Sequence, residues 1–201
     1  LNKRNNFKHK KELKKNNFEN IDLVIVNFYP FEETLKKTNN HNKIVENIDV
    51  GGPTMVRSAA KNYKDVTVIT SNKQYLELIN ELKINKGSTS LNFRKKMANQ
   101  AFNEIAYYDS IIANYFNQIL NTDFSPKKVF YGNLLEKLRY GENPHQKSAF
   151  YSKNKNTDIK KIHGKPLSYN NYNDIFSALT ISKSLPNNIG VTIVKHANPC
   201  G

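Results

Sequence analysis

Residues 21–30 have the sequence IDLVIVNFYP, and this stretch decides the class of fold that the sequence predicts. Residues 21–26 are a continuous apolar run with one acidic residue, which is typical of a strand buried on both faces of a parallel sheet. The residues that follow indicate a turn at the carboxyl end of that strand, where open α/β sheets bind ligands. A second strand-like run at 65–70, with helical patterns around it, predicts an α/β fold.

The segments around these two strands have the patterns of helices. We expect helices at 31–37 and 73–82, and one at 53–63 that begins at a proline, as helices often do. Residues 90–120 carry apolar side chains at helical spacing and predict one long helix or two abutting ones. Residues 1–20 are rich in Lys and Asn without apolar periodicity, so they indicate a solvated loop or a frayed helix.

The pattern changes near residues 121–128, which are typical of a linker. Beyond it four elements are expected: strands at 129–138, 148–151 and 190–195, and a helix at 172–185. The chain is therefore expected to hold pieces of two domains, residues 1–124 and 125–201. Because it starts at a leucine and stops directly after a strand-like run, we also expect it to be an internal piece of a longer protein.

The charge and the cysteine usage restrict the function classes. The 201 residues carry a formal net charge of +14, from 31 Lys and Arg against 17 Asp and Glu. The cations are mostly lysines spread over every expected loop and helix face, whereas bidentate nucleic-acid contacts use arginine. A basic module that binds RNA or another polyanion stays open as an alternative. The single cysteine, Cys200, excludes an internal disulfide framework and favours a reducing compartment.

The segment DVGGPT at residues 49–54 is a candidate anion site. Two glycines before a helix let backbone N–H groups approach a ligand, and the helix dipole favours negative charge there. Asp49 adds a carboxylate and Lys61 a cation, while Tyr29 and Asn27 can form hydrogen bonds to a small polar substrate. Taken alone, the pattern favours a plain helix start with a solvated basic face, because Gly-Gly is a weak motif.

Two loops of the second half carry a high density of polar residues. In residues 138–146 (LRYGENPHQ), Arg139 can bind a phosphate bidentately and Tyr140 can stack on a base. The alternative is a polar loop between domains. In residues 164–171 (GKPLSYNN), Asn170 can contact a substrate, although turn formation is the commoner role of such asparagines.

The last segment, residues 194–201 (VKHANPCG), places a lysine and a histidine side by side after a strand. His196 can move a proton near neutral pH, and Lys195 can stabilise a developing oxyanion. If Lys195 is buried, its charge also keeps the imidazole neutral and basic. A lone Lys-His pair is nevertheless more often structural than catalytic, and Cys200 has no evident base beside it.

Taken together, the order and spacing of these segments resemble one enzyme family. The motifs are NFYPF at 27–31, ENIDVGGPT at 46–54, RSAAKN at 57–62, RYGENPHQ at 139–146 and KHANPCG at 195–201. They are similar to those of the bifunctional purine-biosynthesis enzymes, AICAR transformylase/IMP cyclohydrolase. The resemblance extends from about residue 21 to residue 201.

The resemblance implies the last two steps of IMP synthesis. A formyl group passes from 10-formyltetrahydrofolate to AICAR, and formyl-AICAR then closes to IMP with loss of water. It implies an incomplete, methylglyoxal-synthase-like cyclohydrolase domain with a parallel sheet, followed by the start of an α/β, cytidine-deaminase-like transformylase domain. It also implies a cytosolic homodimer that needs no catalytic metal or redox cofactor and binds neither membrane nor dedicated nucleic acid.

By residue matching, the cyclohydrolase part would use Tyr29, Asp49 and Lys61, with Asn27 and Ile48 lining the nucleotide site. Lys61 and Tyr29 would stabilise the oxyanion as the carboxamide nitrogen attacks the formyl carbon. Asp49 would orient or deprotonate that amide. We therefore expect Tyr29, Asp49 and Lys61 to converge on one cavity.

In the transformylase part, Lys195 and His196 match the catalytic pair, while Arg139, Tyr140 and Asn170 match substrate-binding positions. His196 would help to remove a proton from the attacking amine, and Lys195 would stabilise charge at the formyl centre. The family's Gly-rich phosphate loop, its lysine-bearing loop and most of the transformylase domain have no counterpart in the sequence. We therefore expect little activity from the 201 residues alone, and a nucleotide-binding domain without chemistry is a further alternative.

Overall fold

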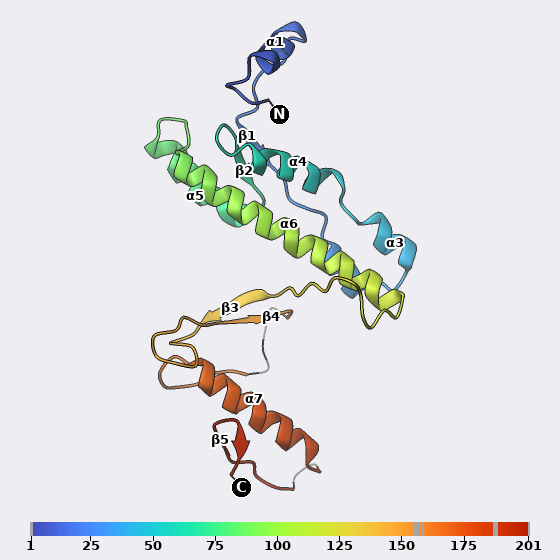
Figure 1. Cartoon of the computed structure of the whole chain (residues 1–201), viewed down its shortest axis with the longest axis vertical. Helices are drawn as coiled ribbons and strands as arrows, with labels where there is room; N and C mark the ends of the chain where they lie inside the picture. The colour runs from blue at the N-terminus through green and yellow to red at the C-terminus, as the bar shows by residue number, and fades with distance from the viewer. Residues whose placement is uncertain (1, 155–156, 158, 187–188, 201) are drawn as a thin grey trace. The chain divides into compact units, whose positions relative to one another are not determined.

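The computed structural model describes residues 2–154, 157, 159–186 and 189–200. The chain divides into two units, Leu1–Phe130 and Tyr131–Gly201 (Figure 1). Gly201, the last residue of the KHANPCG motif, lies outside the described residues. Within them, no helix is long and apolar enough to cross a membrane.

The first unit is built on a small parallel sheet. Strand β1 (Leu23–Ile25) pairs in parallel with β2 (Thr67–Ile69), with Val24 opposite Val68. Parallel strands need a long crossover, and here it contains α2 (Phe31–Lys37), α3 (His41–Glu46) and α4 (Gly51–Lys61). The α/β class predicted from the two apolar runs is confirmed, and the strands are shorter than those runs.

The burial of β1 differs from the prediction. All three residues of β2 are buried, but Leu23 and Ile25 of β1 are 37% and 46% exposed. Side chains two apart share a face of the strand, and only the opposite face, with Val24, packs against the core. Within the described residues β1 has a single neighbouring strand. The expectation that residues 21–26 are buried on both faces is therefore wrong.

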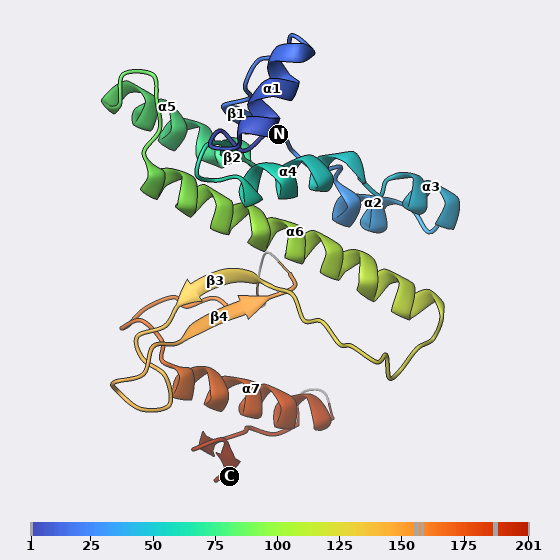
Figure 2. The same ribbon diagram turned by 45° about the horizontal axis from the view of Figure 1, so that its top comes forward.

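The core of the first unit lies between β2, α4 and the long helix α6 (Leu91–Ile119) (Figure 2). Its residues are apolar and fully or nearly fully buried: Val56, Ala59, Ala60, Val66, Val68, Ile69, Leu78, Phe93, Met97, Ala98, Ala101 and Ile105. The alanines let α4 and α6 approach closely. The pattern over residues 90–120 is thus one helix and not two, and it begins where the Ser90 side chain accepts the N–H of Phe93.

The remaining helices of this unit are short. They are α1 (Phe7–Lys15), the 3-10 helix η1 (Asn72–Gln74) and α5 (Tyr75–Ile84). Helix α1 buries no residue, and Asn6 caps it by accepting two backbone N–H groups. Helix α3 was not expected, because six residues are too few to show a periodic pattern.

The second unit contains an antiparallel pair, β3 (Asn133–Lys137) and β4 (Ala149–Ser152), and helix α7 (Tyr169–Ser184). The ring of Phe150 stacks on that of Tyr172 at 4.6 Å, so the strand pair packs on α7. Helix α7 begins three residues before the predicted start, because Ser168 and Asn171 form a capping box.

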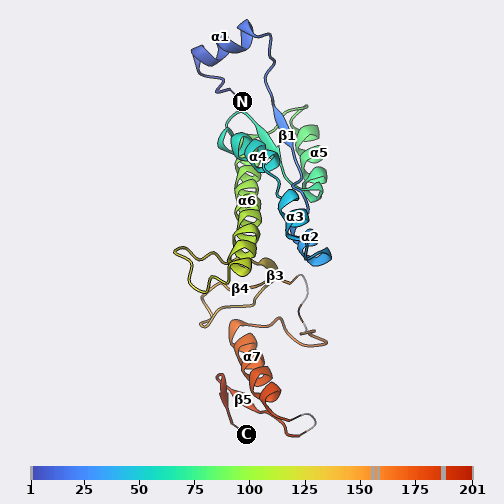
Figure 3. The same cartoon turned by 90° about the vertical axis from the view of Figure 1, so that its right-hand side faces the viewer.

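The predicted strand at 190–195 is mostly absent. Only β5 (Val194–Lys195) is a strand, and it pairs with β6 (Asn198–Pro199) in a hairpin beside α7 (Figure 3). Val191 and Ile193 are 81% and 60% exposed. The apolar run therefore does not form the buried strand that its composition indicates, because no described strand pairs with residues 191–193.

Candidate functional site

The first candidate site lies where β1 ends and α4 begins. Oδ1 of Asp49 accepts the N–H of Gly52 at 2.8 Å, and Oδ2 accepts the N–H of Tyr29 at 3.3 Å. These two bonds link the loop after β1 to the start of α4. The structure thus brings Tyr29 and Asp49 together, with the carboxylate at the positive end of the α4 dipole.

Gly52 is required by the position of that carboxylate. A Cβ atom at residue 52 would lie 2.4 Å from Oδ2 of Asp49, whereas one at Gly51 would meet no atom within 4 Å. The two glycines of the motif therefore differ: one leaves space for the acidic side chain, and the other stands in open space.

The groups at this site remain available to a ligand. The side chain of Tyr29 is exposed, and Asn27 is exposed beside it. Ile48 and Asp49 are half-buried. Each carboxylate oxygen of Asp49 accepts one backbone N–H and keeps a further lone pair, so Asp49 can still accept a hydrogen bond from a substrate amide.

Lys61 does not join this group. It is the exposed last residue of α4, an unbroken helix that starts at Gly51. Ten residues of helix rise about 15 Å, so Lys61 and Asp49 are at opposite ends of α4. The convergence of Tyr29, Asp49 and Lys61 on one cavity is therefore not observed.

The sequence did not predict one residue that contacts this site, Tyr108. The hydroxyl of Tyr108, on α6, accepts the backbone N–H of Asp49 at 2.8 Å. Burial raises the pKa of Tyr108 above its ordinary value; the hydrogen bond from the Asp49 N–H opposes this shift, and the charges of Asp49 and Asp109 add to it. No sequence signal indicates this contact, because the two residues are 59 apart and Tyr108 belongs to the apolar stripe of a long helix.

The second candidate site, in the second unit, brings three predicted residues together. The guanidinium of Arg139 lies over the ring of Tyr140, 4.8 Å from its centroid, and donates to the Tyr140 hydroxyl at 3.1 Å. Hydrogen bonding from Ser168, and then from Arg139, holds the pKa of Tyr140 below its ordinary value. Asn170 donates to the carbonyl of Glu142 at 3.0 Å, so it joins the same loop.

Lys195 and His196 lie on the hairpin between β5 and β6. The turn residues His196 and Ala197 both have positive φ, 54° and 61°, a conformation that costs free energy for residues other than glycine. The N–H of Ala197 donates to Oδ1 of Asp174 at 2.8 Å. Asp174 lies one helical turn after Asn170 on α7, so the hairpin is attached near the start of that helix.

Both side chains of the Lys195–His196 pair are exposed. Lys195 is therefore not buried within this chain, and burial was the condition for its charge to act on the neighbouring imidazole. Asp174, like Tyr108, was missed: its bond to the turn spans 23 residues, and an acidic residue inside a helix carries no signal of such a partner.

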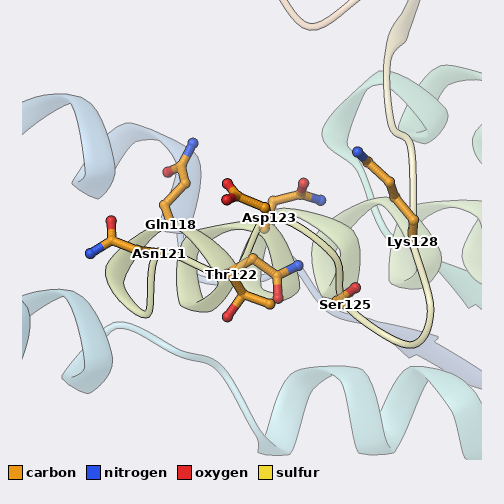
Figure 4. Close-up of a pocket in the computed structure, with 8 residues that line it drawn as sticks. Gln118, Asn121, Thr122, Asp123, Ser125 and Lys128 are labelled. Carbon is orange, nitrogen blue, oxygen red and sulfur yellow. The ribbon is translucent and has the colours of Figure 1, made fainter.

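A separate pocket lies at the end of α6 and has a volume of about 360 Å³ (Figure 4). Polar side chains line it: Asn114, Asn117, Gln118, Asn121, Thr122, Asp123, Ser125 and Lys128. None of the predicted site residues is among them, so this pocket is unrelated to either candidate site.

The comparison with known families gives a direct match. The family described as "AICARFT/IMPCHase bienzyme" matches residues 59–201. The chain belongs to this family. The resemblance seen in the five motifs is confirmed. The AICARFT/IMPCHase match includes Lys61 and the predicted residues of the second unit, whereas Tyr29 and Asp49 precede it.

Curated relatives of the AICARFT/IMPCHase chain align with its first unit as well. The bifunctional purine biosynthesis protein PurH of Rhizobium rhizogenes is 43% identical over 204 residues, covering 98% of this chain and 38% of that protein. PurH of Acetivibrio thermocellus is 44% identical over 205 residues, covering 98% and 40%. The chain thus spans about two fifths of the length of these relatives. Among solved structures, the crystal structure of ForH is 28% identical, with a TM-score of 0.49 over 57% of this chain and 59% of that one.

Proposed function

We propose that this chain is part of an enzyme that catalyses the last two steps of IMP synthesis. The observation that carries the proposal is the 43% identity to a bifunctional purine biosynthesis protein over 98% of the chain. The first step transfers a formyl group from 10-formyltetrahydrofolate, a co-substrate, to the 5-amino group of AICAR. The second closes formyl-AICAR to IMP with loss of water.

The two units are proposed to belong to the two activities. Residues 1–124 would be the C-terminal part of a methylglyoxal-synthase-like cyclohydrolase domain, and residues 125–201 the start of a cytidine-deaminase-like transformylase domain. The division of the structure after Phe130, six residues from this boundary, supports the assignment. We further propose a homodimer that works in the cytosol without a resident metal or redox cofactor.

In the cyclisation, the carboxamide nitrogen attacks the formyl carbon and a C–N bond forms. Asp49 accepts the amide proton or orients the amide, and its fixed carboxylate supports this role. The hydroxyl of the exposed Tyr29 donates to the oxyanion that develops on the formyl oxygen. That oxygen takes up the protons lost by the carboxamide and formamido nitrogens, and it leaves as water when its C–O bond breaks. Asn27 and Ile48 line the nucleotide site.

Lys61 enters this proposal through its match to the family alone. It was expected to share the oxyanion with Tyr29, but Lys61 ends α4, about 15 Å along the helix from Gly51, whereas Asp49 lies before its start. A contribution of Lys61 to cyclisation is therefore proposed to act on another part of the bound nucleotide.

In the formyl transfer, His196 takes a proton from the 5-amino group as it attacks the formyl carbon, and Lys195 stabilises charge on the formyl oxygen. The bond from the formyl carbon to N10 then breaks, and tetrahydrofolate leaves. Arg139, Tyr140 and Asn170 bind AICAR. Their joint placement at the start of α7, together with the attachment of the His196 turn to Asp174, supports these roles.

The proposal is tested by separating the two activities in the full-length protein. Formyl transfer to AICAR and cyclisation of formyl-AICAR are measured independently for His196→Ala and Asp49→Asn. His196→Ala should abolish formyl transfer and keep cyclisation, and Asp49→Asn should do the reverse. Retention of both activities by both variants would refute the roles, and polyanion binding with a steep salt dependence and no turnover would favour the basic-module alternative.

A further inference from the structure

Tyr108 contacts both segments of the proposed cyclohydrolase site, residues 47–49 and residues 28–31. Its hydroxyl accepts the N–H of Asp49 at 2.8 Å and lies 3.5 Å from the carbonyl oxygen of Asn47. Its side chain is 6% exposed, so these contacts are shielded from water. A hydrogen bond to a backbone group in such surroundings restrains the position of the residue that makes it.

The ring of Tyr108 packs against the second segment, residues 28–31. Its centroid lies 5.1 Å from that of Phe28, at an interplanar angle of 57°, and 6.2 Å from that of Phe31, at 65°. Both are favourable aromatic geometries. Phe28 and Phe31 stand on either side of Tyr29 and Pro30, so the ring restrains the chain before and after Tyr29 while leaving its side chain exposed.

We propose that Tyr108 is a positioning residue for cyclisation, which fixes the backbone of Asp49 through its hydroxyl and the chain around Tyr29 through its ring. The inference rests on the proposed function. The carboxylate of Asp49 has its own two backbone donors, so Tyr108 removes the remaining freedom of the residue, the movement of its main chain. A tyrosine with the ordinary pKa of about 10 already keeps its proton at neutral pH, and burial raises the pKa of Tyr108 further.

Tyr115 provides a matched control on the same helix. It lies two turns after Tyr108, is 8% exposed, and packs edge-on against Phe31 at 6.0 Å. Its hydroxyl lies 2.7 Å from Nδ1 of His41, in α3, and so bonds to a different segment. Removing the Tyr115 hydroxyl breaks its bond to His41, and removing the Tyr108 hydroxyl breaks the bond from Asp49 and the longer one to Asn47. The aromatic surroundings are similar, but only Tyr108 bonds to Asp49.

The test compares Tyr108→Phe, Tyr115→Phe and Asp49→Asn in the full-length protein. Cyclisation of formyl-AICAR gives kcat and KM, and amide hydrogen exchange reports on the Asp49 N–H. Tyr108→Phe should lower kcat about tenfold or more, because small misplacements of a catalytic group are costly, and should leave KM within about twofold. The Asp49 amide should exchange faster in this variant alone, and Tyr115→Phe should keep kcat within about twofold.

Three results would overturn the inference or its premise. Wild-type kcat in Tyr108→Phe, with cyclisation lost in Asp49→Asn, would overturn the role of Tyr108 alone. Equal losses in Tyr108→Phe and Tyr115→Phe would show that only general packing is involved, and would also overturn it. Full cyclisation by Asp49→Asn would refute the proposed function of Asp49.

Discussion

Oδ1 of Asp49 lies 2.8 Å from the backbone nitrogen of Gly52, and a Cβ atom on Gly52 would approach Oδ2 of the same carboxylate to 2.4 Å. The acidic side chain therefore occupies the space that any other residue at position 52 would need. This relationship explains why the second glycine of the GGP sequence matters for the site, while the first has no such constraint.

Gly52→Ala should displace the Asp49 carboxylate and lower the kcat of cyclisation about tenfold or more. Gly51→Ala is the matched control and should keep kcat within about twofold, with thermal stability equal or slightly higher, because alanine is the better helix former. Steady-state kinetics and thermal unfolding measure both. Equal activity of the two variants would contradict the steric argument.

Asp174→Ala should release the His196 turn, because it removes the acceptor of the Ala197 N–H. We expect formyl transfer to fall about tenfold, with cyclisation unchanged, and faster hydrogen exchange at the Ala197 amide. Asp174→Asn keeps an oxygen at the Oδ1 position and should restore at least about half of the activity. If Asp174→Asn does not restore formyl transfer although its Ala197 amide exchanges at the normal rate, the charge of Asp174 matters and the hydrogen bond does not.

The pKa values of two tyrosines in the second unit should be shifted in opposite directions. The pKa of Tyr140 is lowered by hydrogen bonds from Ser168 and Arg139, whereas burial, followed by Glu136, raises the pKa of Tyr172. Tyr140 should increase the free energy of unfolding as the pH rises from its folded pKa to its unfolded value of about 10, because the folded state releases this proton first. The contribution of Tyr172 to the free energy of unfolding is present below its unfolded pKa of about 10 and is lost as the pH rises to its higher folded pKa.

Ultraviolet titration measures this difference directly. Tyr140→Phe should remove the earliest phenolate step, and Tyr172→Phe should remove one of the latest. If Tyr140→Phe leaves the early part of the titration unchanged, the hydrogen bonds to its hydroxyl do not favour the phenolate.

Lys61→Ala tests the residue that the structure separates from Asp49. If Lys61 is catalytic, as its match to the family implies, cyclisation should fall about tenfold or more. Lys64→Ala, which removes an exposed lysine just beyond the same helix, is the control and should keep the rate within about twofold. An unchanged rate in Lys61→Ala would end the assignment.

The sequence predicted those features that depend on neighbours along the chain. The strand before residue 27, the span of α2 and the helical character of residues 90–120 follow from apolar spacing and turn residues, although that spacing left one helix or two open. The burial of β1 and the failure of residues 191–193 to pair could not be predicted, because an apolar run does not specify which strands lie beside it.

The motifs themselves, and with them the family and the identity of the candidate residues, were determined by the sequence alone. Only the tertiary structure decided that Tyr29 lies beside Asp49 while Lys61 is at the far end of α4, and that Tyr108 and Asp174 form hydrogen bonds with the backbone of the two candidate sites. The physical reason is that these relationships depend on an unbroken helix and on hydrogen bonds between residues 20 to 59 positions apart, which local sequence patterns do not encode.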